Sequence, residues 1–372
     1  MTWSFEIGKL FGIPLRVHVT FLLLLFLVFI TPPGEHGFGG FMGAAFVAAL
    51  FACVVIHELA HSLVARHYGV PVRHIILLPI GGISMMERMP DEPHQEFNVA
   101  VVGPLASLVL GLVLGAIVYF IGGLSPLMHP MRLDGYHFLA RLAWLNLILA
   151  GFNLLPAFPT DGGRVLRAIL ALHMDYAQAT HTAAVIGQLM AILLGVWGLL
   201  GGNILLLLIA VFVYMGASAE DTQVRLRHTL REVPATSAMV SEFRSLDKDE
   251  PLSDAFAFAS HSYQHDFPVT DEGQLVGLVT RQALISGIHE RGGDVKVAEV
   301  MVGNPCRVGP NDSLADIYQQ ISTGACPIAA VVEGNQLLGL VTPESVSQYV
   351  LASAYQRRGG HTPGQPLQEP PA

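Results

Sequence analysis

Long apolar runs dominate the first 219 residues of the chain. A helix of about 20 apolar residues spans a bilayer. Runs of about that length lie at residues 17–32, 41–65, 97–121, 138–155, 182–199 and 204–219. The last two belong to one uncharged stretch that the residues GLLGGN (198–203) interrupt, which predicts a tight helical hairpin. We therefore predict about six transmembrane helices, with both termini on the same side of the membrane.

The segment between the second and third runs has a different pattern. Its sequence, VRHIILLPIGGISMMERMPDEP (72–93), is too short and too broken to cross a bilayer as a helix. Gly81 and Gly82 lie between two apolar arms, which predicts a β-hairpin or a re-entrant loop. Non-helical backbone at membrane depth persists only where protein or a water-filled cavity covers it. We expect a membrane-associated β-hairpin here.

Basic residues are distributed unequally between the loops on the two sides. The opposite loops hold Arg132 and, at the edge of a span, Arg141. The side that holds the termini has Lys9, Arg16, Arg66, Arg73, Arg88, Arg164, Arg167, Arg225, Arg227 and Arg231. Cytoplasmic loops carry an excess of Lys and Arg. This distribution predicts a multi-pass protein of the cell inner or plasma membrane with cytoplasmic N- and C-termini.

After Arg231 the chain alternates apolar and polar residues and contains an internal repeat with an offset of 62 residues. The residues QLVGLVT (274–280) recur as QLLGLVT (336–342), and Met239-Val240 recurs as Met301-Val302. Each copy ends in an apolar strand, a Thr and a short helical segment, which predicts one soluble α/β domain. We predict a membrane domain at 1–232, a paired domain at 233–352 with repeats at about 235–290 and 297–350, and a disordered Pro/Gly-rich tail at 353–372.

Composition agrees with a membrane protein. Hydrophobic residues make up 52% and charged residues 13% of the chain, with a mean hydropathy of +0.51, whereas soluble domains have about 25% charged residues. The net charge of −9 and the lack of a dense basic cluster argue against nucleic acid as a partner. Cys53, Cys306 and Cys326 form no CxxC motif, so we expect free, buried thiols.

The second apolar run ends in the residues HELAH (57–61). His57 and His61 are four residues apart on a predicted helix, so both imidazoles face the same side and can bind one zinc ion. Glu58 then lies beside the open position of the metal. Ionisable groups within a membrane are rare and usually functional. The alternative is a helix end whose polar side chains only reach the cytosolic interface.

A catalytic zinc site usually has three protein ligands and a water molecule, so one ligand is missing from HELAH. The segment LNLILAGFNLLPAFPTDGGRVLRA (145–168) supplies Asp161. Pro156 and Pro159 end the regular helix, and Gly162-Gly163 allows a sharp turn. Asp161 is thus predicted near the cytosolic side of its span, at the same depth as His57. The alternative role of Asp161 is an ordinary helix N-cap.

HELAH in a transmembrane helix, followed by FNLLPAFPTDGG (152–163), resembles the site-2 protease family of intramembrane zinc metalloproteases. The six predicted spans and the C-terminal repeats are similar to the branch with paired CBS domains. The resemblance covers residues 5 to 350. It implies a polytopic α-helical membrane protein with a soluble α/β tandem CBS domain, one zinc ion per chain bound by His57, His61 and Asp161, and Glu58 as the catalytic base.

The resemblance also implies a function and partners. The expected enzyme is a metalloendopeptidase that cleaves a single-pass membrane protein, such as an anti-sigma factor, in or near its transmembrane segment. Asn153 matches the Asn of the family motif and either binds a substrate carbonyl or oxyanion or packs between helices. Asn146 is a weaker candidate for the same task, and Thr160 stands where the family often has an apolar residue, an exchange that we expect to be harmless.

The resemblance implies that the paired CBS domains regulate the protease or form a dimer, and some CBS domains bind an adenine nucleotide. Nucleotide-binding copies carry an Asp three residues after the Thr of GLVT, where this chain has Ala283 and Ser345. This difference disfavours nucleotide binding. The alternative roles of the CBS domains are formation of a homodimer and docking of a partner. A CBS-regulated membrane transporter or channel would explain the C-terminal repeats equally well, but it would not need HELAH or Asp161.

Overall fold

The computed structural model describes residues 3–32, 39–86, 92–128 and 136–357, apart from 263, 265, 304, 325 and 335. The chain divides into two compact units, Met1–Val224 and Arg225–Ala372. We describe each unit by itself.

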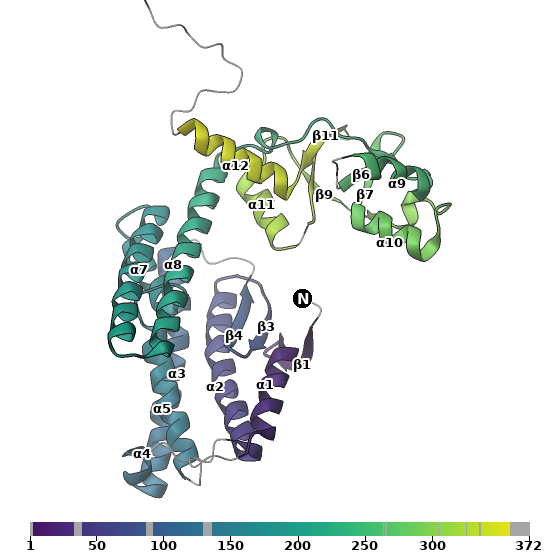
Figure 1. Ribbon diagram of the computed structural model, residues 1–372. Helices are drawn as coiled ribbons and strands as arrows, with labels where there is room; N and C mark the ends of the chain where they lie inside the picture. The colour runs from purple at the N-terminus through teal and green to yellow at the C-terminus, as the bar shows by residue number, and fades with distance from the viewer. Residues whose placement is uncertain are drawn as a thin grey trace, which may run out of the picture. The chain divides into compact units, whose positions relative to one another are not determined.

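The N-terminal unit is built on long helices (Figure 1). Their bounds are Val19–Ile30 (α1), Gly40–His67 (α2), Pro93–Gly122 (α3), Ser125–Met128 (α4), Tyr136–Asn153 (α5), Asp161–Leu170 (α6), Tyr176–Leu200 (α7) and Ile204–Arg231 (α8). Among the described residues, α2, α3, α7 and α8 are long and apolar enough to cross a membrane, whereas α1 is apolar but has only 12 residues. The described structure therefore supports a helical membrane protein, and the count of six spans stays a prediction.

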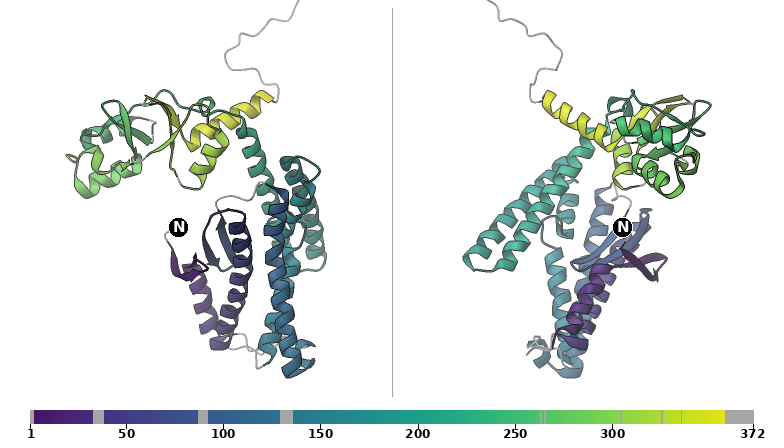
Figure 2. Two further views of the ribbon diagram at one scale, coloured as in Figure 1. Left: turned by 180° about the vertical axis from the view of Figure 1, so that it is seen from behind. Right: turned by 45° about the vertical axis from the view of Figure 1, so that its right-hand side comes forward.

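Many large apolar side chains on these helices are exposed. Phe120 of α3 is 83% exposed and Leu200 of α7 is 84% exposed, and apolar residues along α1 and α8 are exposed as well. Exposed apolar surface on this scale is typical of a membrane-facing region. Helices α7 and α8 form a close hairpin, which is seen side-on in Figure 2. Their turn contains Gly201, Gly202 and Asn203, as the interrupted apolar stretch predicts.

A four-stranded sheet with the order β1-β2-β3-β4 lies beside α2. Its strands are Ser4–Leu10, Ile13–His18, Val72–Leu78 and Gly81–Met86. Strands β3 and β4 pair antiparallel, with Leu78 opposite Gly81. A hairpin thus forms at the expected segment, and β4 is an edge strand of the sheet. Contact of this hairpin with the membrane stays a prediction.

Helix α3 is the central support of the N-terminal unit, because it packs against α2, α5 and α6. Glu92 precedes it and Pro93 opens it, as Pro often does at the first helical position. Its packing against both α2 and α6 means that residues of α3 lie near HELAH and near Asp161 at the same time.

The C-terminal unit contains two similar halves. In the first, α9 (Leu252–His261) precedes the antiparallel pair β6 (Asp266–Asp271) and β7 (Gln274–Thr280), and α10 (Arg281–Arg291) follows. In the second, α11 (Leu314–Ser322) precedes β10 (Ala329–Glu333) and β11 (Gln336–Val341), and α12 (Pro343–Arg357) follows. The short elements are η1 (Ala235–Ser237), β5 (Leu246–Asp247), η2 (Val297–Glu299), β8 (Val302–Gly303) and β9 (Cys306–Val308).

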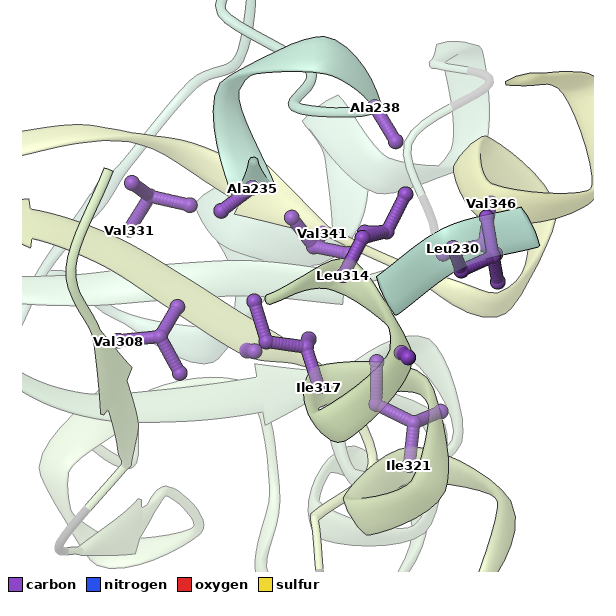
Figure 3. Packing of buried hydrophobic residues seen from close by; sticks show 12 residues of the cluster. Leu230, Ala235, Ala238, Val308, Leu314, Ile317, Ile321, Val331, Val341 and Val346 are labelled. Atoms are coloured by element: carbon purple, nitrogen blue, oxygen red, sulfur yellow. The ribbon is translucent and has the colours of Figure 1, made fainter. Parts of the chain in front are cut away.

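The two halves exchange their first segments. Val302 of β8 pairs with Leu278 of β7, and Val240 forms a bridge with Leu340 of β11. Ala235 therefore belongs to the core of the second half, together with residues such as Leu314 and Val341 (Figure 3). Neither half can complete its core without the other, so the repeats fold as one unit.

Two expectations need correction or restriction. Cys306 and Cys326 form a disulfide with a Cα–Cα distance of 6.1 Å, whereas Cys53 is free and buried. The expectation of three free thiols is thus wrong, because the parallel pairing of β9 and β10 brings the two segments together. The predicted tail begins at residue 353, but α12 continues to Arg357, and residues 358–372 lie outside the described residues. Arg88 and Arg132 also lie outside them.

Candidate metal centre

The two histidines of HELAH meet inside the N-terminal unit. Helix α2 runs without interruption through His57 and His61, whose exposed fractions are 4% and 6%. Their Nε2 atoms lie 3.1 Å apart, because residues four apart on a helix stand one above the other. The two imidazoles thus lie on the same side of α2, as the sequence predicts.

Asp161 completes this group from 100 residues away. It is the first residue of α6, and its Oδ2 lies 3.2 Å from Nε2 of His57 and 3.2 Å from Nε2 of His61. Three potential ligand atoms, two nitrogens and one oxygen, therefore form a nearly equilateral triangle. The structure brings together the three residues that the sequence singles out as zinc ligands.

The loop before α6 is held by Thr160. Its Oγ1 donates hydrogen bonds to the carbonyl oxygens of Leu155 and Ala157, at 2.8 Å and 2.7 Å. The sequence predicts a sharp turn at Gly162 and Gly163, but both residues lie within α6. A Cβ at either position would overlap the backbone of residues 154–158, so these glycines permit close packing of the helix against its own loop.

Helix α3 supplies a partner to each imidazole. Nδ1 of His61 donates to the carbonyl oxygen of Val99 at 2.6 Å, and Nδ1 of His57 lies 2.9 Å from Oγ of Ser107. A carbonyl oxygen can only accept, so Nδ1 of His61 carries the proton. In the neutral ring, Nε2 then presents a lone pair to the centre of the triangle. Metal-binding histidines commonly use the second nitrogen in this way.

These dimensions fit a zinc ion. Ligand atoms at about 2.0–2.2 Å from one zinc in tetrahedral geometry lie about 3.3 Å from one another, close to the separations of 3.1 Å and 3.2 Å found here. Among the described residues, His57, His61 and Asp161 are the group of metal-binding type that lies close enough to share one ion. Two imidazoles and one carboxylate leave a fourth tetrahedral position open.

Glu58 is half-buried and follows His57 directly on α2. Ser84 of β4 donates a hydrogen bond to Oε2 of Glu58 at 2.6 Å. Ser62 donates to the carbonyl oxygen of Glu58 at 2.8 Å and also contacts the Ser84 hydroxyl at 3.2 Å. The edge strand of the sheet is thus joined to the glutamate of HELAH through serine hydroxyls.

The two asparagines differ in their surroundings. Asn146 is fully buried in α5, where its Nδ2 donates to the carbonyl oxygen of Leu142 at 2.8 Å. This bond within its own helix favours the structural role. Asn153, the last residue of α5, is half-buried. The amide of Asn153 has no hydrogen-bond partner among the described residues, so it is the better candidate for contact with a substrate.

Several residues near the centre cannot be identified from the sequence pattern. Ser84, Val99 and Ser107 touch HELAH, yet each lies between 26 and 50 residues from the residue that it contacts. A serine within an apolar helix is a usable signal for Ser107, because such a hydroxyl needs a partner. Neither Ser84 nor Val99 carries a comparable signal.

Comparisons with known proteins place the chain beside peptidases and CBS-domain proteins. Residues 45–136 and 128–195 match the family model of peptidase family M50, and residues 230–290 match the CBS domain. The zinc metalloprotease MJ0392 of Methanocaldococcus jannaschii is 35% identical over 93% of this chain and 96% of its own length. A solved site-2 protease from the same organism is 40% identical and covers 59% of this chain and 95% of its own, with a TM-score of 0.43.

A membrane helix that carries HExxH, a distant aspartate within ligand distance and this extent of identity define a zinc metalloprotease. The chain belongs to the site-2 protease family, peptidase family M50, in the branch with C-terminal CBS domains. These matches favour an enzyme over the alternative interpretation as a CBS-regulated transporter or channel.

Proposed function

We propose that this enzyme hydrolyses a peptide bond in or near a transmembrane segment of a single-pass membrane protein. The observation that carries the proposal is the triangle of His57, His61 and Asp161, which is built from apolar segments of the chain. Ionisable groups within apolar helices are usually retained for function. We assign these three residues as ligands of one zinc ion per chain.

Each residue has a separate task in this proposal. When bound, zinc lowers the pKa of a water molecule and polarises the carbonyl that is attacked. Glu58 takes the proton of the attacking water and later passes it to the leaving amine. Asn153 hydrogen-bonds the carbonyl oxygen of the substrate. Ser84 keeps the Glu58 carboxylate in place, and Ser62 supports Ser84 through contact with its hydroxyl.

The substrate has to be unwound, since helical carbonyls are already hydrogen-bonded within the helix. Among the described residues, no further strand pairs with β4 on its outer edge. An unwound substrate segment could be held there, because an extended peptide can pair with an edge strand. Ser84 of the same strand contacts Glu58. A peptide added to β4 would therefore lie near the catalytic base.

The remaining assignments concern the membrane and the CBS domains. We propose six membrane spans, cytoplasmic termini in the inner or plasma membrane, and a membrane-associated β3–β4 hairpin. The CBS domains regulate the protease or form a homodimer. Ser345 supports a role without nucleotide, because its Oγ accepts from the backbone N–H of Thr342 at 3.0 Å within its own turn. Calorimetric titration of the full chain with ATP tests this, and heat of binding at millimolar ATP would contradict it.

The substrate class is tested by comparing membrane proteomes of cells with the wild type and with Glu58→Gln. We expect fragments of single-pass proteins, cut within their apolar segments, only in the wild-type cells. Purified Glu58→Gln should keep its zinc and lose about 10²–10⁴-fold in cleavage rate. Identical fragments in both cells would contradict the proposed function.

A further inference from the structure

A second group of charges lies buried in the N-terminal unit. Arg167 of α6 is 1% exposed, and its Nε donates to Oε1 of Glu96 at 2.8 Å. Its Nη2 donates to the same oxygen, and its Nη1 donates to Oε1 of Glu220 in α8 at 2.5 Å. The rings of Phe158 and Tyr176 each lie 5.0 Å from the guanidinium carbon. The charge pattern of the loops assigns Arg167 to a cytoplasmic loop, whereas the structure encloses it.

Such a pair needs an explanation other than stability. Removing two charges from water is unfavourable, and replacement of a buried ion pair by apolar residues is often neutral or stabilising. What a buried pair can provide is a fixed relative position of the two elements that carry it. Glu96, which is 1% exposed, lies on α3, and Arg167 lies on α6. Their ion pair can therefore fix the position of α6 relative to α3.

These two helices are the ones on which the metal centre depends. Glu96 precedes Val99 by less than one turn of α3, and Val99 orients His61. Ser107 of the same helix contacts His57. Arg167 follows Asp161 on α6, about 9 Å further along the helix axis. The ion pair therefore joins the helix that orients both imidazoles to the helix that carries the carboxylate.

We infer that Glu96 and Arg167 are positioning residues that set α6 against α3 so that Asp161 reaches the two histidines. This inference rests on the proposed ligand set. The contact with Glu220 ties α6 to α8, which carries none of the proposed ligands. Loss of Glu220 should therefore leave the triangle in place, whereas loss of Glu96 or Arg167 should loosen it.

The test measures the zinc affinity of the purified full-length protein by competition with a chelator, and the absorption spectrum of the cobalt-substituted protein. Arg167→Met and Glu96→Gln should weaken zinc binding about tenfold, at the lower end of the range for residues that support metal ligands. Their cobalt spectra should shift from that of the wild type. Arg167→Lys should recover part of the affinity. Glu220→Gln should bind zinc as the wild type does.

A double variant separates positioning from folding. Glu96→Leu with Arg167→Met removes both charges of the pair, and the carboxylate of Glu220, whose side chain is 28% exposed, can turn to water. This variant should therefore fold with unchanged or higher thermal stability and still bind zinc about tenfold more weakly. Gln188→Ala, which removes the contact with Ser218 between α7 and α8, is the control for general loss of packing.

Two results would overturn the inference in distinguishable ways. Wild-type zinc affinity and cobalt spectrum in the double variant, together with weaker binding in Asp161→Asn, would reject positioning and keep the ligand set. A wild type that binds no zinc would reject the ligand set and the positioning role together.

Discussion

Gly103 of α3 lies directly against the imidazole of His61. A Cβ atom at this position would overlap Nε2, Cε1 and Cδ2 of the ring. The closest of these atoms is Nε2 of His61, which is the atom that we assign as the metal ligand. Helix α3 therefore packs closely against HELAH at Gly103, where the absence of a side chain leaves room for the imidazole. Val99 and Ser107, on either side of Gly103, provide the hydrogen-bond partners of the two histidines.

Gly103→Ala should therefore abolish tight zinc binding. Alanine is favoured over glycine in a helix by about 1 kcal/mol, so a defect would come from the clash with His61 and not from helix propensity. We expect zinc affinity to fall by about 100-fold, in line with the loss of a well-oriented ligand, measured by chelator competition.

Gly115→Ala is the matched control for that change. Gly115 lies on the same helix, and a methyl group added there would meet no side chain and no other segment of the described chain within 4 Å. Its zinc affinity should equal that of the wild type. Equal affinities of Gly103→Ala and Gly115→Ala would show that His61 does not occupy the described position.

Ser107→Ala should weaken zinc binding about 10–100-fold, because Nδ1 of His57 loses its partner and the ring loses its fixed orientation. Chelator competition on the purified protein measures the change. Ser218→Ala removes a serine hydroxyl from α8, away from the histidines, and should leave the affinity unaltered. A wild-type affinity for Ser107→Ala would mean that this hydroxyl does not orient His57.

Ser84→Ala should separate catalysis from metal binding. The hydroxyl donates to the carboxylate of Glu58 and not to a proposed zinc ligand. Hydrogen bonds to charged groups contribute about 1.5–3 kcal/mol, so we expect the cleavage rate to fall about tenfold or more while the zinc content stays at one per chain. Ser218→Ala is the control in the same assay. A cleavage rate of Ser84→Ala equal to that of the wild type would show that Ser84 does not support the catalytic base.

Local periodicity explains why much of the centre is predictable. The spacing of His57 and His61 on a helix determines a shared face, and the depth of Asp161 in its apolar segment indicates that it can reach them. The helical hairpin at residues 198–203 and the antiparallel pair around Gly81 follow from glycines between apolar stretches. In each case the signal lies within a few residues of the feature.

The remaining features depend on contacts between distant segments. The partners of the imidazoles, Val99 and Ser107, are determined by how α3 packs on α2. The pairing of Cys306 with Cys326 depends on the register of β9 and β10. Arg167 resembles a loop charge because its partner Glu96 lies 71 residues earlier. Neither composition nor periodicity carries information at that range.

Zinc content of the purified wild type and of Asp161→Ala, measured after dialysis against a chelator, tests the central assignment most directly. Three protein ligands should retain one zinc per chain in the wild type, whereas the two histidines that remain in Asp161→Ala should lose it. Equal zinc retention by both proteins, or no zinc in the wild type, would contradict the assignment of His57, His61 and Asp161 as the metal ligands.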